Sequence, residues 1–460
     1  MKPNILLILA DDLGCGDIGA FNNGLTQTPA LDALLRESVC LTQSYAASPV
    51  CNPSRACLLT GRYPHRTGSI DTLEWRGLER LALRETTLAD VLQAAGYATG
   101  LVGKWHLGAF DERYHPRRRG FAESVCFRGG MHDYYAWRIE HGDSVLRGDG
   151  RYLTDVWTDE AIQFIERHQR EPFFLHLAYN APHTPLQAPI EDIAPFFDSP
   201  TTRGVQTLYG MIRRMDQGIG RVLDTLQRLG LRENTIVLFA SDNGPQFGGE
   251  GAYKLDRFNC HFYGAKGSVH EGGIRVPAML RWPAGLDGAH TRDAMVHFSD
   301  WFPTLLAMAG VAPPPDRHLD GVNVLPMLRG ETGQTCTKRF WQWNRYTPVG
   351  TCNAAVRDGD WKLVRPAIAE AMDAPCAKQW LKISMYEPEI LIAQGLVRDP
   401  EPARTIPSPA PPELYNLAHD PYESTNIANQ HPNQTRRLLH DLESWFESVE
   451  RDRSTINDAR

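Results

Sequence analysis

The chain has 460 residues, enough for two or three domains of about 150 residues each. Apolar residues make up 42% and charged residues 22%, an ordinary globular composition that excludes a collagen, a coiled coil and a disordered tail protein. The 48 basic and 55 acidic side chains give a net charge of −7 without a basic block, so we expect no nucleic-acid partner. No apolar run approaches the ~18 residues of a membrane span, so we expect none.

The nine cysteines show no disulfide framework, and Cys51 and Cys57 do not have a zinc-ligand spacing. A mostly reduced chain is therefore the first expectation. The first residues lead straight into an apolar segment with no signal-peptide cleavage site. We expect a cytoplasmic protein if Met1 is native, and a periplasmic or secreted one if a signal peptide has been removed.

Residues 4–10 (NILLILA) are continuously apolar, which is typical of a strand buried on both faces of a parallel sheet. The pattern then predicts a helix at 87–95, a strand at 98–103, a helix at 158–168, a strand at 173–179, a helix at 208–229, a strand at 235–240 and a short strand at 276–281. This alternation predicts an α/β fold, with a large, mostly parallel sheet sandwiched by helices.

The pattern changes beyond about residue 330. Residues 354–357 and 360–364 flank Asp358-Gly359, which indicates a hairpin and antiparallel pairing. Nine prolines between 366 and 412 predict a long irregular segment, and residues 436–449 place apolar side chains on one helix face. We predict a large α/β domain at 1–335 and a smaller α+β domain at 336–460, with an antiparallel sheet and a terminal helix.

Polar side chains follow four of the predicted strands. They are, in chain order, Asp11 and Asp12, Lys104 and His106, His183, and Asp242 and Asn243. Because ligands bind outside the carboxyl ends of the strands in an open α/β sheet, we expect these side chains to form one site. Each has an ordinary alternative, since an acid after a strand often caps a helix and a loop histidine is usually a surface residue. Four such coincidences at one edge favour a site.

The three aspartates would repel one another in a small volume unless a cation lies between them. Together with the amide oxygen of Asn243 they are hard oxygen ligands, which suit Ca²⁺ or Mg²⁺. Zinc is disfavoured because no histidine or thiolate stands beside these acids in sequence. The basic residues Lys104, Lys266 and Arg55, with a divalent ion, outweigh the aspartates, so the site fits an anionic substrate.

Residues 51–62 read CNPSRACLLTGR, a complete C-x-P-S-R-x-x-x-L-T-G-R signature. On this segment the chain resembles the type I, formylglycine-dependent sulfatases of the alkaline-phosphatase-like superfamily. Further segments are similar to that family: NILLILADDLGCGDIG at 4–19, GKWHLG at 103–108, PHTP at 182–185, SDNG at 241–244 and GAKGSVHEGGIRVP at 264–277. The resemblance covers nearly the whole chain and is weakest at about 365–412. Cys15 departs from it, because many relatives place an aromatic residue there.

The resemblance implies a sulfuric ester hydrolase with residues 1–335 as its catalytic domain. A formylglycine-generating enzyme would convert Cys51 to formylglycine, whose gem-diol attacks the sulfur of a sulfate monoester. Arg55 holds the diol and His106 assists its second hydroxyl. The sulfate oxygens are bound by Lys104, His183 and Lys266, and Lys266 or His183 protonates the leaving oxygen. The implied metal ligands are Asp11, Asp12, the converted Cys51, Asp242 and Asn243, with Ca²⁺ favoured over Mg²⁺. Conversion of Cys51 leaves eight cysteines, so the odd number no longer indicates a reducing compartment.

The substrate is expected to be an aryl or carbohydrate sulfate. Candidate contacts to its sugar or aryl group are His132, Trp343 and Arg345, although such aromatic segments equally suit a seam between the domains. One alternative is a phosphonate monoesterase or phosphodiesterase of the same superfamily. A remote alternative is a non-catalytic binding protein in which Cys51 stays unmodified. No pattern in the chain indicates an oligomeric state.

Overall fold

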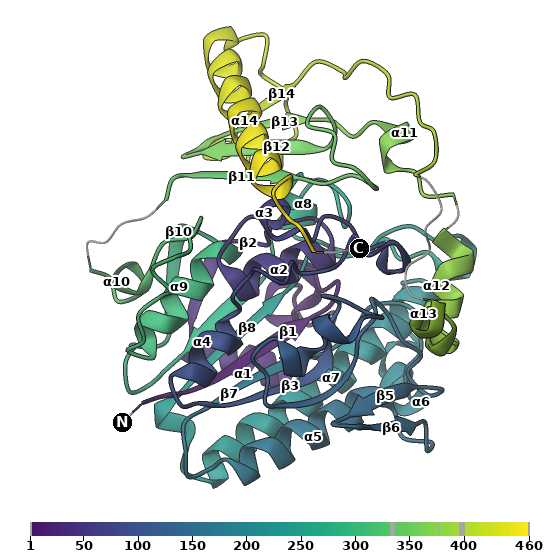
Figure 1. The fold of residues 1–460 in the computed structure, drawn as a ribbon, viewed down its shortest axis with the longest axis vertical. Helices are drawn as coiled ribbons and strands as arrows, with labels where there is room; N and C mark the ends of the chain where they lie inside the picture. The colour runs from purple at the N-terminus through teal and green to yellow at the C-terminus, as the bar shows by residue number, and fades with distance from the viewer. Residues whose placement is uncertain (1, 332–335, 376, 395–400, 459–460) are drawn as a thin grey trace.

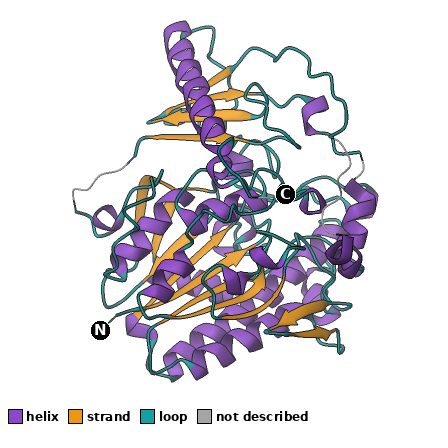
Figure 2. Cartoon of the chain, viewed as in Figure 1, coloured by secondary structure: helices purple, strands orange, loops and turns teal. Residues whose placement is uncertain are grey.

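The computed structural model describes residues 2–331, 336–375, 377–394 and 401–458. A ten-stranded sheet crosses the body of the molecule, and a four-stranded sheet lies to one side of it (Figures 1 and 2). The large sheet has the order β10-β2-β9-β8-β1-β7-β3-β4-β5-β6. Its strands are β1 (Asn4–Ala10), β2 (Val39–Tyr45), β3 (Ala98–Lys104), β4 (Glu123–Phe127), β5 (Arg138–His141), β6 (Ser144–Arg147), β7 (Phe173–Ala178), β8 (Thr235–Ser241), β9 (Ala278–Arg281) and β10 (His290–His297).

The middle of the large sheet is parallel. β8, β1, β7, β3 and β4 run in the same direction, whereas β9 is antiparallel to both of its neighbours and β5 and β6 form an antiparallel edge. The predicted mostly parallel α/β sheet is therefore confirmed. Ala10 pairs with Ser241, so β1 and β8 end side by side.

The apolar run of β1 divides between two cores. Ile5, Leu7 and Leu9 pack on one face of the sheet, and Leu6 and Ile8 on the other, because successive side chains of a strand point to opposite faces. Helices cover both faces, which explains why this strand is apolar throughout. The helices before the small sheet are α1 (Pro29–Glu37), α2 (Cys51–Thr60), α3 (Pro64–Thr67), α4 (Leu88–Ala94), α5 (Leu153–Arg167), α6 (Ile190–Ile193), α7 (Arg203–Arg228), α8 (Glu271–Ile274), α9 (Phe298–Met308) and α10 (Leu325–Leu328).

The small sheet is antiparallel, in the order β11 (Lys338–Gln342), β12 (Ala354–Asp358), β13 (Trp361–Arg365) and β14 (Glu413–Asn416). The predicted hairpin is the β12–β13 pair, and Gly359 in its turn has a φ of 61°. The terminal helix α14 (Pro432–Arg453) crosses this sheet (Figure 1) and packs on it through Leu438, Leu442, Trp445 and Val449. Residues 332–335, at the predicted domain boundary, lie outside the described residues, so the boundary stays a prediction.

One sequence expectation is wrong in the proline-rich segment. Residues 366–412 contain three helices, α11 (Ala369–Met372), α12 (Ala377–Tyr386) and α13 (Pro388–Gln394), where an irregular segment was expected. Six of the nine prolines lie at 400–412, after the helices. Pro388 opens α13, a helix position that proline tolerates because its missing N–H has no intrahelical partner.

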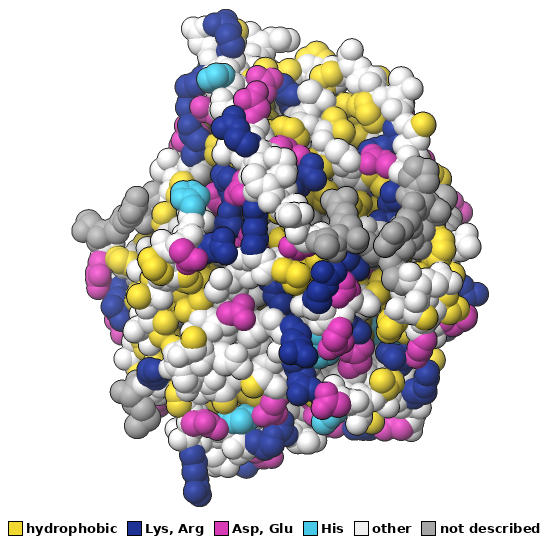
Figure 3. Space-filling model, in the orientation of Figure 1, with side chains coloured by type: hydrophobic (Ala, Val, Ile, Leu, Met, Phe, Trp, Pro, Cys, Tyr) yellow, Lys and Arg dark blue, Asp and Glu magenta, His cyan; other side chains and the backbone are white. Residues whose placement is uncertain are grey.

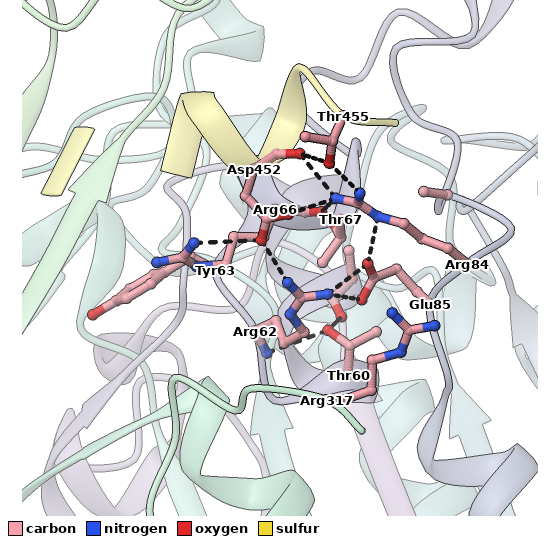
Figure 4. Close-up of polar contacts among 12 residues, drawn as sticks. Thr60, Arg62, Tyr63, Arg66, Thr67, Arg84, Glu85, Arg317, Asp452 and Thr455 are labelled. Carbon is pink, nitrogen blue, oxygen red and sulfur yellow. Dashed lines mark hydrogen bonds and ion pairs between the residues drawn. The ribbon is translucent and has the colours of Figure 1, made fainter. Parts of the chain in front are cut away.

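The end of α14 is fixed to the segment that follows α2. The Asp452 carboxylate accepts hydrogen bonds from Arg62 at 2.6 Å and Arg84 at 2.8 Å and pairs with Arg66 at 3.4 Å (Figure 4). Elsewhere, acidic and basic side chains are interspersed on the face shown in Figure 3. Within the described ranges, every helix is too short or too polar to cross a membrane.

Candidate active site

The carboxyl ends of four neighbouring parallel strands bring the predicted residues together. Asp11 and Asp12 follow β1, and Asp242 and Asn243 follow β8. On the other side, β7 leads to His183, and β3 ends in Lys104 with His106 two residues later. All seven side chains have an exposed fraction of 11% or less. The rim expected from the strand pattern is present in the structure.

Cys51 opens helix α2, whose ten residues are all buried. Its Sγ lies 3.3 Å from His106 Nδ1. His106 has a φ of 55° in the left-handed region, so the chain turns sharply after Lys104 to direct this ring at the thiol. Burial raises the pKa of the Cys51 thiol, against the opposing effect of the Lys104 and Lys266 charges. The unmodified thiol is therefore a poor nucleophile here.

Two buried cations neutralise the two aspartates nearest Cys51. Arg55, one turn into α2, donates from Nε to Asp242 Oδ2 at 2.8 Å, with its Nη2 at 2.7 Å from the same oxygen. Lys104 Nζ donates to Asp11 Oδ2 at 2.7 Å. Burial and the neighbouring Asp11 charge raise the pKa of Asp242 to about 6 in spite of Arg55.

The third aspartate faces the opposite side of the site. Asp12 accepts hydrogen bonds from Lys266 Nζ at 2.8 Å and from Asn243 Nδ2 at 2.7 Å, and His183 Nε2 lies 3.6 Å from its Oδ2. Burial opposes ionisation of Asp12, but the Lys266 and His183 charges outweigh it and lower the pKa of Asp12. His183 Nδ1 donates to the Thr184 carbonyl oxygen at 2.7 Å, which leaves Nε2 facing the site.

Two unpaired side-chain oxygens in the site are suitable ligands for a hard divalent cation. Asp11 Oδ1 and Asn243 Oδ1 are buried, and neither has a hydrogen-bond partner among the described residues. Buried polar atoms are normally paired, so these two are expected to bind another ligand. Ligand atoms of Asp11, Cys51 and Asp242 lie within 4.8 Å of one another, as do those of Asp11, Asp12 and His183. The oxygen-rich donor set suits Ca²⁺ or Mg²⁺.

A cavity of about 670 Å³ opens over Cys51, His106, His183 and Lys266. Trp343 and Arg345 line it, and their contact with substrate stays a prediction. Arg345 Nη1 donates to Asp71 Oδ1 at 2.9 Å, and its guanidinium lies 5.0 Å from the Trp343 ring centroid. These two residues come from the segment after β11, so the small sheet contributes to the cavity wall.

His132 lies apart from that cavity. Its Nε2 is 2.8 Å from the Arg138 carbonyl oxygen and its Nδ1 accepts from the Asp133 backbone N–H at 2.9 Å, so both ring nitrogens are engaged within its own loop. It lines a smaller neighbouring cavity.

Several cavity residues were not expected from the sequence. They are Thr72, Leu73, Glu74, Trp75, Gly130, Gln246, Phe247 and Leu381. Gln246 and Phe247 lie directly after the SDNG segment and Pro245, so their place near the site could have been predicted from the sequence. No local pattern marks Glu74, whose Oε1 accepts from Ser384 Oγ on α12 at 2.6 Å. The eight described cysteines are free, and Cys376 lies outside the described residues.

Comparison with known proteins agrees with this geometry. A family model described as Sulfatase matches residues 3–311, and one described as N-sulphoglucosamine sulphohydrolase, C-terminal, matches residues 260–372. The chain is 35% identical over 392 residues to the human N-acetylgalactosamine-6-sulfatase, which covers 74% of this chain and 72% of the relative. It is 33% identical to the mouse steryl-sulfatase, over 72% of this chain and 65% of the relative.

Among solved structures, that of Ps i-CgsB in complex with k-i-k-neocarrahexaose superposes with a TM-score of 0.80 at 30% identity. The match covers 97% of this chain and 93% of that one, so the two share both the large sheet and the smaller one. The extent of the family match and the identity to the human relative leave no other assignment: the chain belongs to the sulfatase family, with its alkaline-phosphatase-like fold, and is a sulfatase.

Proposed function

We propose that the protein hydrolyses the sulfate monoester of a carbohydrate, using a formylglycine made from Cys51 and a divalent cation, Ca²⁺ in preference to Mg²⁺. In this proposal residues 1–335 are the catalytic domain, and residues 336–460 complete the substrate cavity with Trp343 and Arg345. The observation that carries it is the position of Cys51 Sγ, within 4.8 Å of ligand oxygens of Asp11 and Asp242 and 3.3 Å from His106 Nδ1.

The converted residue supplies the nucleophile and, when bound, the cation supplies positive charge to the nucleophile and the sulfate oxygens. Asp11, Asp12, Asp242, Asn243 and the converted Cys51 hold that cation. The Sγ atom of Cys51 stands in for the oxygen that formylglycine carries at this position.

The other residues bind, orient and move protons. Arg55 fixes the oxygens of residue 51, because it lies one turn along the same helix and is itself held by Asp242. His106 takes the proton from residue 51 when sulfate is released, since its Nδ1 already faces that atom. Lys104 keeps positive charge beneath the sulfate, paired with Asp11.

Lys266 and His183 approach the sulfate from the cavity side. The Lys266 ammonium carries protons to donate, whereas His183 uses its Nδ1 proton on the Thr184 carbonyl and presents an unprotonated Nε2 when the ring is neutral. We therefore assign protonation of the leaving oxygen to Lys266. Sulfate binding is assigned to Lys266 and to the imidazolium form of His183, which alone has an Nε2 proton to donate.

A carbohydrate sulfate is supported by the relatives and by the cavity. The human relative is an N-acetylgalactosamine-6-sulfatase, and a similar solved structure holds a neocarrahexaose. The cavity of about 670 Å³ is within the range of small-molecule sites, and the Trp343 face beside Arg345 suits a sugar ring with polar substituents.

Two measurements test the proposal. Mass spectrometry of the tryptic peptide 37–55 from protein made in its native host should show the thiol-bearing side chain of Cys51 replaced by an aldehyde, the work of a formylglycine-generating enzyme. A peptide with only a free thiol would refute the nucleophile. Paired aryl sulfate and aryl phosphonate esters should show faster turnover of the sulfate, and the reverse order would favour a phosphonate monoesterase. A panel of sulfated mono- and oligosaccharides then identifies the substrate.

A further inference from the structure

We infer that Asn353, directly before strand β12 of the small sheet, is a positioning residue that sets the place of Lys266 in the active site. The inference rests on the proposed role of Lys266 as the proton donor to the leaving oxygen. Asn353 precedes β12 and has an exposed fraction of only 2%. It has no contact with the cavity, so it acts through the residues that it holds.

The Asn353 side chain joins two walls of the cavity. Its Nδ2 donates to the Gly267 carbonyl oxygen and to the Trp343 carbonyl oxygen, both at 2.8 Å. Its Oδ1 accepts from the Val269 backbone N–H at 3.2 Å. The Asn353 amide therefore uses both of its N–H donors and its oxygen to bind the loop that carries Lys266 and the backbone of Trp343.

Other hydrogen bonds also hold the loop around Lys266, and the Lys266 ammonium itself donates to Asp12 at 2.8 Å. The Lys266 backbone N–H donates to the Pro245 carbonyl oxygen at 2.9 Å, and that of Gly267 donates to the Pro49 carbonyl oxygen at 2.8 Å. Those bonds hold the loop to the segments around Pro245 and Pro49, within the large domain. Asn353 ties the same loop to the small sheet, so we expect that loss of its amide shifts the loop and with it the Lys266 ammonium.

The backbone of Asn353 is adapted to this task. Its φ of 46° lies in the left-handed region, which asparagine and glycine adopt more readily than other residues. Its backbone N–H donates to the Pro366 carbonyl oxygen at 3.1 Å, and its carbonyl accepts from the Trp343 N–H at 3.2 Å. Asn353→Gly therefore removes the amide and keeps the turn, which makes it the cleaner test variant.

The experiment measures kcat/KM for a series of aryl sulfates, from 4-nitrophenyl sulfate to unsubstituted phenyl sulfate. A more basic leaving oxygen depends more on protonation, so a displaced Lys266 should impair phenyl sulfate more. We expect Asn353→Gly to lose roughly tenfold more kcat/KM on phenyl sulfate than on 4-nitrophenyl sulfate, because small misplacements of a catalytic group are costly. Lys266→Ala should show the same selective loss on phenyl sulfate, to a larger extent.

Asn22 provides a matched control in the same chain. It is equally buried, and its amide also makes three bonds, to the Gly16 carbonyl oxygen at 2.9 Å, to Thr26 Oγ1 at 2.7 Å and from the Thr26 N–H at 3.4 Å. Asn22→Gly should lower thermal stability and change both esters by the same factor.

Asn353→Asp is the second variant, for use if the glycine variant folds poorly. It keeps the shape and the acceptor for Val269 but places an oxygen against the carbonyls of Gly267 and Trp343. We expect the same selective loss on phenyl sulfate. A uniform loss in both Asn353 variants, with a selective loss in Lys266→Ala, would overturn the inference alone. A uniform loss in Lys266→Ala as well would overturn the proposed role of Lys266 together with it.

Discussion

The substitution Asp452→Asn removes the charge that three arginines share at the end of α14. Asp452 pairs with Arg62 at 2.6 Å, Arg84 at 2.8 Å and Arg66 at 3.4 Å, and its side chain is 25% exposed. After the substitution two acids remain to balance them: Glu85, 2.7 Å from Arg62 and 3.4 Å from Arg84, and Asp320, 3.2 Å from Arg66. The arginines are better shielded from water than a surface pair, but the carboxylate is partly screened by solvent.

The exposure of Asp452 and the burial of its arginine partners determine the expected loss in free energy of unfolding. Breaking a fully buried pair costs about 3–5 kcal/mol and an exposed pair contributes about 0–1 kcal/mol. Two short contacts and one long contact at a carboxylate with intermediate exposure place the loss in free energy of unfolding at about 2 kcal/mol. Because Asp452 is remote from Cys51 in the site geometry, kcat on an aryl sulfate at 25 °C should stay within about twofold of the wild type.

Urea unfolding followed by tryptophan fluorescence suits this test, because Trp445 on α14 stacks on Phe340 of the small sheet with ring centroids 5.1 Å apart. The control is Asp159→Asn, which breaks one exposed pair with Arg221 at 2.7 Å and should cost no more than about 0.5 kcal/mol. A loss for Asp452→Asn no larger than that of the control would refute the view that this cluster secures α14 to the large sheet.

Other expected outcomes concern the site and its pH dependence. Lys266→Ala and His183→Ala should fold normally yet lose about 10²–10³ in kcat on an aryl sulfate, and near-wild-type turnover by either variant would contradict its assigned role. Chelation should lower both activity and the melting temperature, and Ca²⁺ at about 100 times its Kd should restore about 2.7 kcal/mol of stability; a melting temperature indifferent to Ca²⁺ would argue against the cation site. Burial lowers the pKa of His65 from 6.5 to about 4, so its neutral form favours folding. This residue should contribute about 2 kcal/mol to the fall in free energy of unfolding from pH 7 to pH 5, measured by urea unfolding as the difference between the falls of the wild type and of His65→Gln; equal falls in the two proteins would contradict it.

The strands and helices of the middle of the fold could be predicted because their patterns are strong. β1 has the predicted bounds, and β3, β7 and β8 differ from the prediction by one residue at the end. Helix α7 begins five residues before its prediction at 208, because the polar first turn there carries a cap by Thr202 rather than an apolar stripe. The edge strand β10 and its neighbour β2 were missed, since their partly exposed residues break the apolar pattern.

The candidate site was likewise predictable in one part and unpredictable in another. Side chains at strand ends, such as Asp11 and Asp242, converge because parallel neighbours end together, and this can be deduced from order along the chain. The cavity wall is set by loops that are distant in sequence, so nothing local connects Glu74 with Ser384 or Asn353 with Gly267. His132 shows the converse, a polar residue near an aromatic run whose ring serves its own loop.

The complete burial of α2 has a consequence for how the enzyme matures. A modifying enzyme has to reach Cys51 and its neighbours in the signature, whereas here Cys51, Pro53 and Arg55 are all buried in α2. If Cys51 is converted as we propose, the conversion has to take place while the chain is still being made or held open. Folding then makes Cys51 inaccessible to the modifying enzyme. Molecules that fold before the conversion would accumulate as stable, inactive protein, and later exposure to the enzyme would not activate them.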